Sequence, residues 1–299
     1  MSRIHLATPP VFRFAPSPNG ELHLGHARSA LLNQQLAQDS GGRLLLRIED
    51  IDLARCTPQF EAGIYRDLEW LGVEWEQPVR RQSEHFADYA AALERLKQMG
   101  VVYPAFMSRG QIRDYIAESE TPTRRWPRDP DGAPLYPDAD RARSRRERSR
   151  RIAAGDPYAW RLDVDAALAK APGGLTWTEF GVGPMEQTGT VPARPEIWGD
   201  VILSRSDAPA SYHLSVTVDD AIQGVTDVVR GQDLFHATAI HRLLQVLLGL
   251  PEPHYRHHRL IVGDDGRKLA KSRRDTGLRA LRDSGVSVEE VRRMALDGL

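Results

Sequence analysis

We expect an α/β fold, a doubly wound parallel sheet that is split by an insertion and followed by a short C-terminal helical segment. Three observations predict it. Strand-like, helical and strand-like runs follow one another between residues 11 and 48. A stretch rich in proline, glycine, aspartate and arginine interrupts this pattern from about residue 106 to residue 195, and regular apolar runs then return. Alternating strands and helices are typical of a parallel sheet, so the interruption predicts an insertion between its two halves.

The first runs form a βαβ unit. Residues 11–15 have strand character, residues 26–38 carry alanine and leucine at helical spacing, and residues 44–48 read as a buried strand. Such a unit favours a right-handed crossover. The stretch His23-Leu24-Gly25-His26 therefore lies beyond the C-terminal end of a strand and at a helix start, where open α/β sheets bind their ligands.

The remaining elements follow from similar patterns. Thr57 before Pro58 indicates a helix start, and that helix runs to about residue 71. We also expect helices over residues 83–100 and 233–248 and after Ser287, and strands over residues 101–103, 201–203 and 214–218. The chain then divides into a first half of a nucleotide-binding domain (1–105), the insertion (106–195), a second half (196–262) and a lysine-motif segment with C-terminal helices (263–299).

Composition limits the class of protein. Of 299 residues, 41% are apolar and 27% are charged, as in ordinary globular domains. No apolar run is long enough to span a bilayer, and the N-terminal residues lack a signal-peptide pattern. Cys56 is the only cysteine, which excludes an internal disulfide and favours a reducing, cytoplasmic setting. We take Cys56 as a spectator thiol.

Charge is unevenly distributed although the net charge is only −1. Seven arginines fall between Arg141 and Arg151. Such a cluster can follow RNA phosphates, or it can be a solvated surface segment, and both readings stay open here.

Two distant motifs suit a polyphosphate. His23 and His26 can donate hydrogen bonds to phosphate oxygens at a helix N-terminus, and Gly25 lets a flat purine rest against the backbone. Lys268 and Lys271 follow a turn signal, so they can close over a triphosphate from a loop. The alternatives are ordinary surface histidines and a solvated basic loop.

A third set of residues suits an acidic amino acid. Arg13, Glu49, Tyr212 and Arg230 each stand at or near the end of an expected strand. The guanidinium groups can bind carboxylates, while the carboxylate and the phenol can bind an ammonium group. The alternative is a set of structural ion pairs.

Taken together, these stretches resemble the catalytic domain of a class I aminoacyl-tRNA synthetase of the glutamyl type. The resemblance rests on seven pieces, in the family's order: residues 13–20 (RFAPSPNG), 23–26 (HLGH), 47–52 (RIEDID), 212–214 (YHL), 218–220 (VDD), 229–234 (VRGQDL) and 268–272 (KLAKS).

The resemblance implies a Rossmann-type fold and residue roles. His23, His26, Lys268 and Lys271 would be catalytic. ATP, bound as its Mg²⁺ complex, would contact His23, Gly25, His26, Lys268, Lys271 and Ser272. L-Glutamate would contact Arg13, Ala15, Ser17, Glu49, Tyr212 and Arg230.

Length discriminates within that family. Glutamyl-tRNA synthetases carry a large helical anticodon-binding region after the lysine motif, whereas 27 residues follow Ser272 here. The chain thus resembles the short paralogue, which activates glutamate without tRNA and transfers it to queuosine at the wobble position of tRNA(Asp). We expect a monomer without an anticodon-binding domain. A truncated enzyme that charges tRNA(Glu) and a non-catalytic RNA-binding paralogue are the alternatives.

The family often holds zinc in the insertion. At the matching positions this chain has Ala105, Met107, Tyr136 and Asp140, of which only the tyrosine agrees. Alanine cannot bind a metal and methionine is a poor zinc ligand, so we expect no zinc. Packing around Trp126, Pro127 and Tyr136 would then hold the insertion.

Overall fold

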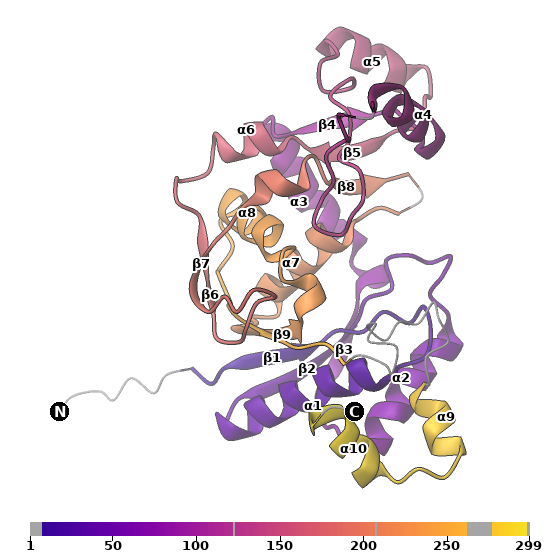
Figure 1. Ribbon diagram of the computed structural model, residues 1–299, viewed down its shortest axis with the longest axis vertical. Coiled ribbons are helices and arrows are strands. Elements are labelled where there is room, and N and C mark those ends of the chain that lie inside the picture. Colours follow the sequence, from indigo (N-terminus) through magenta and orange to yellow (C-terminus); the bar gives the residue numbers. More distant parts are fainter. Residues whose placement is uncertain (1–7, 122, 207, 262–276, 298–299) are drawn as a thin grey trace, which may run out of the picture.

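The computed structural model describes residues 8–121, 123–206, 208–261 and 277–297 (Figure 1). The elements before the insertion are β1 (Val11–Phe14), α1 (Leu24–Asp39), β2 (Arg43–Ile48), α2 (Pro58–Trp70), β3 (Glu76–Arg81), η1 (Gln82–Glu84), α3 (Phe86–Gln98) and β4 (Val102–Ala105). Next come α4 (Arg109–Ser119), α5 (Arg145–Ala153), β5 (Ala159–Leu162), α6 (Val164–Leu168), β6 (Thr176–Glu179), β7 (Gly189–Pro192) and η2 (Pro195–Trp198). The chain continues with β8 (Ile202–Arg205), α7 (Tyr212–Ile222), β9 (Asp227–Gly231), η3 (Gln232–Leu234), α8 (Thr238–Leu248), β10 (His254–His258), α9 (Leu278–Asp283) and α10 (Val288–Asp297).

A seven-stranded sheet in the order β3-β2-β1-β9-β10-β6-β7 forms the centre of the molecule. All neighbouring strands are parallel except the β6–β7 pair at one edge. Phe12 of β1 stands opposite Leu44 of β2, which confirms the predicted βαβ unit. Strands β2 and β3 follow β1 toward one edge of the sheet, and β10 follows β9 toward the other. The carboxyl ends of the parallel neighbours β1 and β9 therefore border the crevice where such sheets bind ligands.

Local sequence explains the helix starts that were predicted. The Thr57 side chain accepts a hydrogen bond from the Phe60 backbone N–H, and Pro58 is the first residue of α2. The Ser287 hydroxyl accepts from the Glu290 N–H at the start of α10. Both start signals are therefore confirmed.

The predicted strand over residues 214–218 is wrong, because these residues lie in helix α7. Ser211 caps the helix by accepting a hydrogen bond from the Leu214 N–H. All residues from Leu214 to Asp220 are buried, so the segment lacks the polar face that marks a helix in a sequence. The expected helix over residues 233–248 also begins later, since a 3₁₀ turn, η3, precedes α8.

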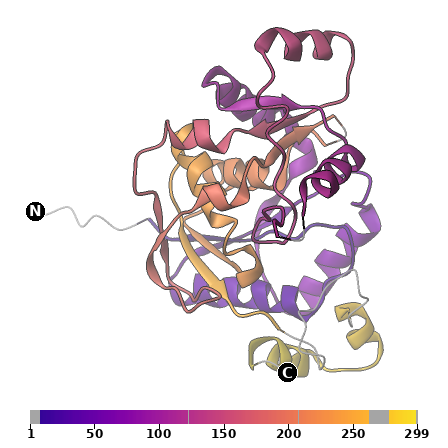
Figure 2. The same cartoon turned by 45° about the horizontal axis from the view of Figure 1, so that its top comes forward.

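The interrupted stretch contains three strands that sequence patterns indicated only weakly. Strand β5 joins β4 and β8 in a separate antiparallel sheet, whereas β6 and β7 extend the main sheet. Helices α4 and α5 lie beyond the small sheet, at the opposite end of the molecule from α9 and α10 (Figure 2). The limits given above for the insertion remain a proposal.

Asp140 connects the end of β4 to the following part of the insertion. Its buried carboxylate accepts hydrogen bonds from the Phe106 N–H at 2.6 Å, from the Met107 N–H at 3.2 Å and from the Tyr136 hydroxyl. The Arg143 Nε donates to the same carboxylate at 2.7 Å. The side-chain and backbone donors thus occupy the oxygens that a metal would need, and the residues do not fit a zinc site.

The expected packing around Trp126, Pro127 and Tyr136 is correct only for part of the set. Tyr136 is buried against Tyr103 and Ala105. Trp126 is half-buried, donates from Nε1 to the Leu135 carbonyl at 2.8 Å and contacts Tyr115, but Pro127 is exposed. The hydrogen bonds to Asp140, and not packing of Pro127, hold this part of the insertion in place.

Replacing Asp140 should loosen the insertion selectively. Asp140→Ala leaves the buried Phe106 N–H without its acceptor, and we expect a loss of about 3 kcal/mol in local stability. Hydrogen exchange at the amides of β4 and α4 measures it. Asp138→Ala is the matched control, because that carboxylate is exposed and, among the residues described, pairs with Arg141 alone. Equal protection in both variants would contradict this role of Asp140.

Candidate functional site

Two adjoining cavities open at the carboxyl ends of the central strands. The first, here called the strand-end cavity, has a volume of about 430 Å³ and is lined by residues at the carboxyl ends of β1, β9 and β10 and at the start of α1, including Arg13, His23, His26, Arg230 and His258. The second, the insertion cavity, has a volume of about 540 Å³ and extends to Tyr136, Arg161 and Asp200. Ser17, Glu49 and Tyr212 line both cavities. The two cavities therefore meet at these three side chains.

The start of helix α1 orients the two histidines. The Nδ1 atom of His23 accepts a hydrogen bond from the Gly25 N–H at 3.1 Å, and Nδ1 of His26 accepts from the His23 N–H at 3.2 Å. A ring nitrogen that accepts carries no proton, so each ring bears its proton on Nε2. This reciprocal capping places both imidazoles in the strand-end cavity with a fixed donor atom.

The packing of the protein itself favours glycine at position 25, in addition to any close approach of a ligand. A Cβ atom at this position would lie 3.0 Å from Cε1 and 3.1 Å from Nδ1 of the His23 ring. Any larger residue would therefore shift the imidazole that caps the helix.

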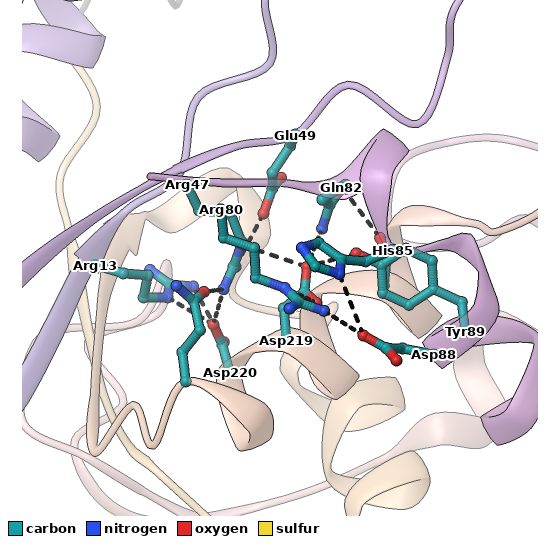
Figure 3. Close-up of polar contacts among 12 residues, drawn as sticks. Arg13, Arg47, Glu49, Arg80, Gln82, His85, Asp88, Tyr89, Asp219 and Asp220 are labelled. Carbon is teal, nitrogen blue, oxygen red and sulfur yellow. Dashed lines mark hydrogen bonds and ion pairs between the residues drawn. The ribbon is translucent and has the colours of Figure 1, made fainter. Parts of the chain in front are cut away.

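Charged side chains from β1, β2, β3 and α7 form a connected and largely buried chain (Figure 3). The Arg13 Nε donates to Asp220 at 3.1 Å, and Arg47 NH1 donates to the same carboxylate at 2.8 Å. Arg47 NH2 also donates to Glu49 at 3.0 Å. Asp219, next to Asp220 on α7, accepts hydrogen bonds from Arg80 Nε, Gln82 Nε2 and the Tyr89 hydroxyl, each at 2.8 Å.

The charge of each group follows from its neighbours. Burial alone would raise the pKa of the Asp220 carboxyl, but the guanidinium groups of Arg13 and Arg47 outweigh it, and the pKa is lowered. Glu49 differs, because burial raises its pKa and Arg47 and Arg13 offset this only in part. Of the two, Glu49 lines the cavities and Asp220 does not.

Arg230 is held more tightly than Arg13. Its Nε donates to His257 Nε2 at 3.1 Å. Its remaining N–H groups donate to the Tyr212 hydroxyl, His241 Nδ1, the Leu234 carbonyl and the Thr238 hydroxyl. All five N–H groups thus have acceptors. The contact to Tyr212, at 3.4 Å, is the longest and the easiest for an entering carboxylate to replace.

His257 connects Arg230 to Glu179. Because its Nε2 accepts from Arg230, its proton lies on Nδ1, 2.6 Å from the Glu179 carboxylate. Glu179 also accepts from the backbone N–H groups of Gly181 and His257. Burial lowers the pKa of His257 to about 4, which keeps the ring neutral near pH 7. A neutral ring can stay beside the guanidinium group without repulsion.

The structure brings most of the predicted site residues together. Those that line the strand-end cavity are Arg13, Ala15, Ser17, His23, Gly25, His26, Glu49, Tyr212 and Arg230. Lys268, Lys271 and Ser272 lie outside the described residues. Their roles in binding and catalysis remain predictions.

Sequence reasoning missed the buried partners of these side chains. Arg47 and Asp220 belong to recognised motifs, but the hydrogen bond between them spans 173 positions in the chain, and no local spacing reveals it. Glu179 lies in the stretch interpreted as insertion, so nothing connected it to Arg230.

Cys56 lies beside the junction of the cavities. Its Sγ is 3.6 Å from the Ser17 hydroxyl. Burial raises the pKa of this thiol, so it stays protonated near pH 7. A raised pKa does not suit a nucleophile.

In the described ranges, no group of three or more histidine, cysteine, aspartate or glutamate side chains could hold a metal ion. None of the described helices is both long and apolar enough to cross a membrane.

Known proteins are similar to this chain in sequence and in fold. The family model for the catalytic domain of class I tRNA synthetases (E and Q) matches residues 11–296. The Glutamyl-Q tRNA(Asp) synthetase of Rhodobacter capsulatus is 46% identical over 288 residues, which cover 95% of this chain and 99% of that protein. The Glutamate–tRNA ligase 2 of Methylobacterium sp. is 39% identical, but the match covers only 60% of its length.

A solved structure agrees with these matches. The glutamate–tRNA synthetase of Elizabethkingia anophelis superimposes with a TM-score of 0.73 at 26% identity, covering 93% of this chain and 54% of that one. The chain thus spans nearly all of the first relative and about half to three fifths of the two longer proteins.

Proposed function

The chain belongs to the class I tRNA synthetases of the E and Q type, and from this we propose that it activates L-glutamate with ATP, without tRNA, and transfers the glutamyl group to queuosine at the wobble position of tRNA(Asp). It is an ATP-dependent ligase of the aminoacyl-tRNA synthetase class. The observation that carries the proposal is the pair of adjoining cavities, because activation and transfer need two binding spaces that meet at one acyl group.

The strand-end cavity supports glutamate as the amino acid. Arg13 donates from Nε and NH2 to Asp220, and in the described structure its NH1 has no partner, so both N–H groups of NH1 can donate to a substrate carboxylate. Arg230 adds a second positive charge. Glu49 stands opposite and suits the ammonium group. An acidic amino acid satisfies all three charges.

Activation then requires positioning and charge stabilisation. A carboxylate oxygen of glutamate attacks the α-phosphorus, and the bond from that phosphorus to the bridging oxygen of pyrophosphate breaks. The Nε2–H groups of His23 and His26 would donate to phosphate oxygens, and Lys268 and Lys271 would neutralise the departing pyrophosphate. Mg²⁺ would enter with ATP. No protein nucleophile is needed.

The insertion cavity supports a second substrate that approaches from the insertion side. It meets the strand-end cavity at Ser17, Glu49 and Tyr212, where an activated glutamyl group would lie, and its lining also includes Asp129, Arg161 and Asp200. Queuosine as the acceptor is supported by the R. capsulatus relative, which is named Glutamyl-Q tRNA(Asp) synthetase and is covered over 99% of its length.

The arginine cluster divides into two sets. Four of the seven arginines contact the protein itself. Arg141 donates to Asp138 and Asp165, Arg143 to Asp140, Arg148 to the carbonyl groups of Asp140 and Arg141, and Arg151 to Asp156. Arg145, Arg146 and Arg150 on α5 are exposed and have no side-chain partner in the part of the chain that the structure describes. We propose that these three bind RNA phosphates.

Removing these three charges should weaken tRNA binding without affecting activation. For Arg145→Gln/Arg146→Gln/Arg150→Gln, we expect the slope of log Kd against log salt concentration to fall by about 2 to 3. Filter binding of tRNA at several salt concentrations measures it. The control changes Arg66, Arg279 and Arg293, which are exposed on α2, α9 and α10 at the opposite end (Figure 1). An equal loss in both variants would contradict a specific RNA face.

The acceptor assignment is tested with labelled glutamate. We expect transfer to tRNA(Asp) that contains queuosine and none to the same tRNA without it. Removal of the tRNA 3′ terminus should leave the label in place. Lys271→Ala provides a control that should lose glutamate-dependent pyrophosphate exchange while it keeps the wild-type circular dichroism spectrum.

Other outcomes identify the alternatives. A label that depends on the 3′ terminus of tRNA(Glu) would indicate a tRNA-charging enzyme. Absence of pyrophosphate exchange in the wild-type protein would indicate a non-catalytic paralogue. Either result would refute the proposed function.

A further inference from the structure

A line of hydrogen bonds connects the two cavities through three buried or half-buried side chains. Arg230 NH1, on β9, lies 3.2 Å from Nδ1 of His241, on α8. His241 Nε2 lies 3.3 Å from Nδ1 of His213, on the first turn of α7. Arg230 lines the strand-end cavity and His213 lines the insertion cavity.

Only one direction of donation is possible along this line. A guanidinium group has donors and no acceptor, so Nδ1 of His241 must accept. The proton of His241 therefore lies on Nε2 and is donated to Nδ1 of His213. Because that nitrogen accepts in turn, the proton of His213 lies on its own Nε2. Arg230 thus determines the tautomers of both rings.

The last atom of the line reaches the insertion cavity. Trp198 packs edge-on against the His213 ring at 5.5 Å between centroids, and Tyr212 contacts it at 5.7 Å. In the described ranges, Nε2 of His213 has no hydrogen-bond partner in the protein, and it is not among the buried atoms that lack one. It therefore borders accessible space.

We infer that His213 is a hydrogen-bond donor of the insertion cavity, held in the Nε2–H tautomer by Arg230 through His241, and that it binds an uncharged oxygen, hydroxyl or carbonyl, of the nucleoside that accepts the glutamyl group. This inference rests on the proposed function, which places that nucleoside in the insertion cavity. His213 cannot be the general base for the attacking hydroxyl, because its only lone pair is taken by His241.

The environment supports neutral rings. Burial, and after it the positive charge of Arg230, lowers the pKa of His213 to about 4. The pKa of His241 is lowered for the same two reasons, burial first and Arg230 second. Neither ring then takes up a second proton near pH 7, and the line keeps its direction.

The tautomers can be measured directly in the full chain without substrate. Long-range ¹H–¹⁵N correlation spectra at pH 7 should show His213 and His241 as Nε2–H tautomers. His257 provides an internal reference with the opposite tautomer, Nδ1–H, because its Nε2 accepts from Arg230. His213→Gln and His241→Gln assign the signals. An Nδ1–H or doubly protonated His213 would overturn the inference, whatever the enzyme acts on.

The role in transfer is tested by separating the two half-reactions. For His213→Phe, we expect the single-turnover transfer rate to fall about tenfold more than the rate of pyrophosphate exchange, since one donor to the acceptor is lost. His213→Gln should recover part of the loss, because its amide can donate. Equal losses in both half-reactions would indicate a merely structural role and overturn the inference, as would unchanged transfer.

These outcomes are distinguishable from a failure of the proposed function. Wild-type protein that exchanges pyrophosphate but does not label queuosine would refute the acceptor assignment, and with it the role of His213 in transfer. The measured tautomers would still decide the direction of the line from Arg230 to His213.

Discussion

Two adjacent carboxylates on helix α7, Asp219 and Asp220, determine how this helix meets the strands of the central sheet. Three neighbouring strands each send an arginine to them, Arg13 from β1, Arg47 from β2 and Arg80 from β3. Arg47 and Asp219 are fully buried, so neither charge is tolerable without its partners. The two carboxylates therefore fix the position of α7 against the ends of the strands.

Both cavities follow from that position. Helix α7 presents Tyr212 and His213 from its first turn, one toward the junction of the cavities and the other toward the insertion. Asp220 also orients Arg13 and Arg47, and Arg47 in turn pairs with Glu49. The side chains proposed to bind glutamate are thus aligned by charges that do not line the cavity. Glu179 of β6 and His257 of β10 orient Arg230 in the same way, because Glu179 pairs with His257 and His257 accepts a hydrogen bond from Arg230.

Much of this arrangement could be predicted from sequence where the signal is local. The βαβ unit and the capped start of α2 depend on neighbouring residues, and the cavity residues stand at strand ends as expected. Helix α7 could not be recognised, because its residues from Leu214 to Asp220 are all buried and so show no separate polar face. The bonds from Arg47 to Asp220 and from Asp140 to Phe106 depend on tertiary structure, which no spacing encodes.

Asp220→Asn tests the role of the two carboxylates, because it removes one negative charge and keeps the shape of the side chain. Because Arg13 loses its carboxylate partner and Arg47 loses one of three, we expect a loss of about 3 kcal/mol in the free energy of unfolding and a rise of at least about tenfold in the KM for glutamate in pyrophosphate exchange. The KM for ATP should change little. Asp114→Asn, on exposed α4, is the control. Wild-type stability and an unchanged KM for glutamate in Asp220→Asn would show that this carboxylate neither stabilises the fold nor positions Arg13.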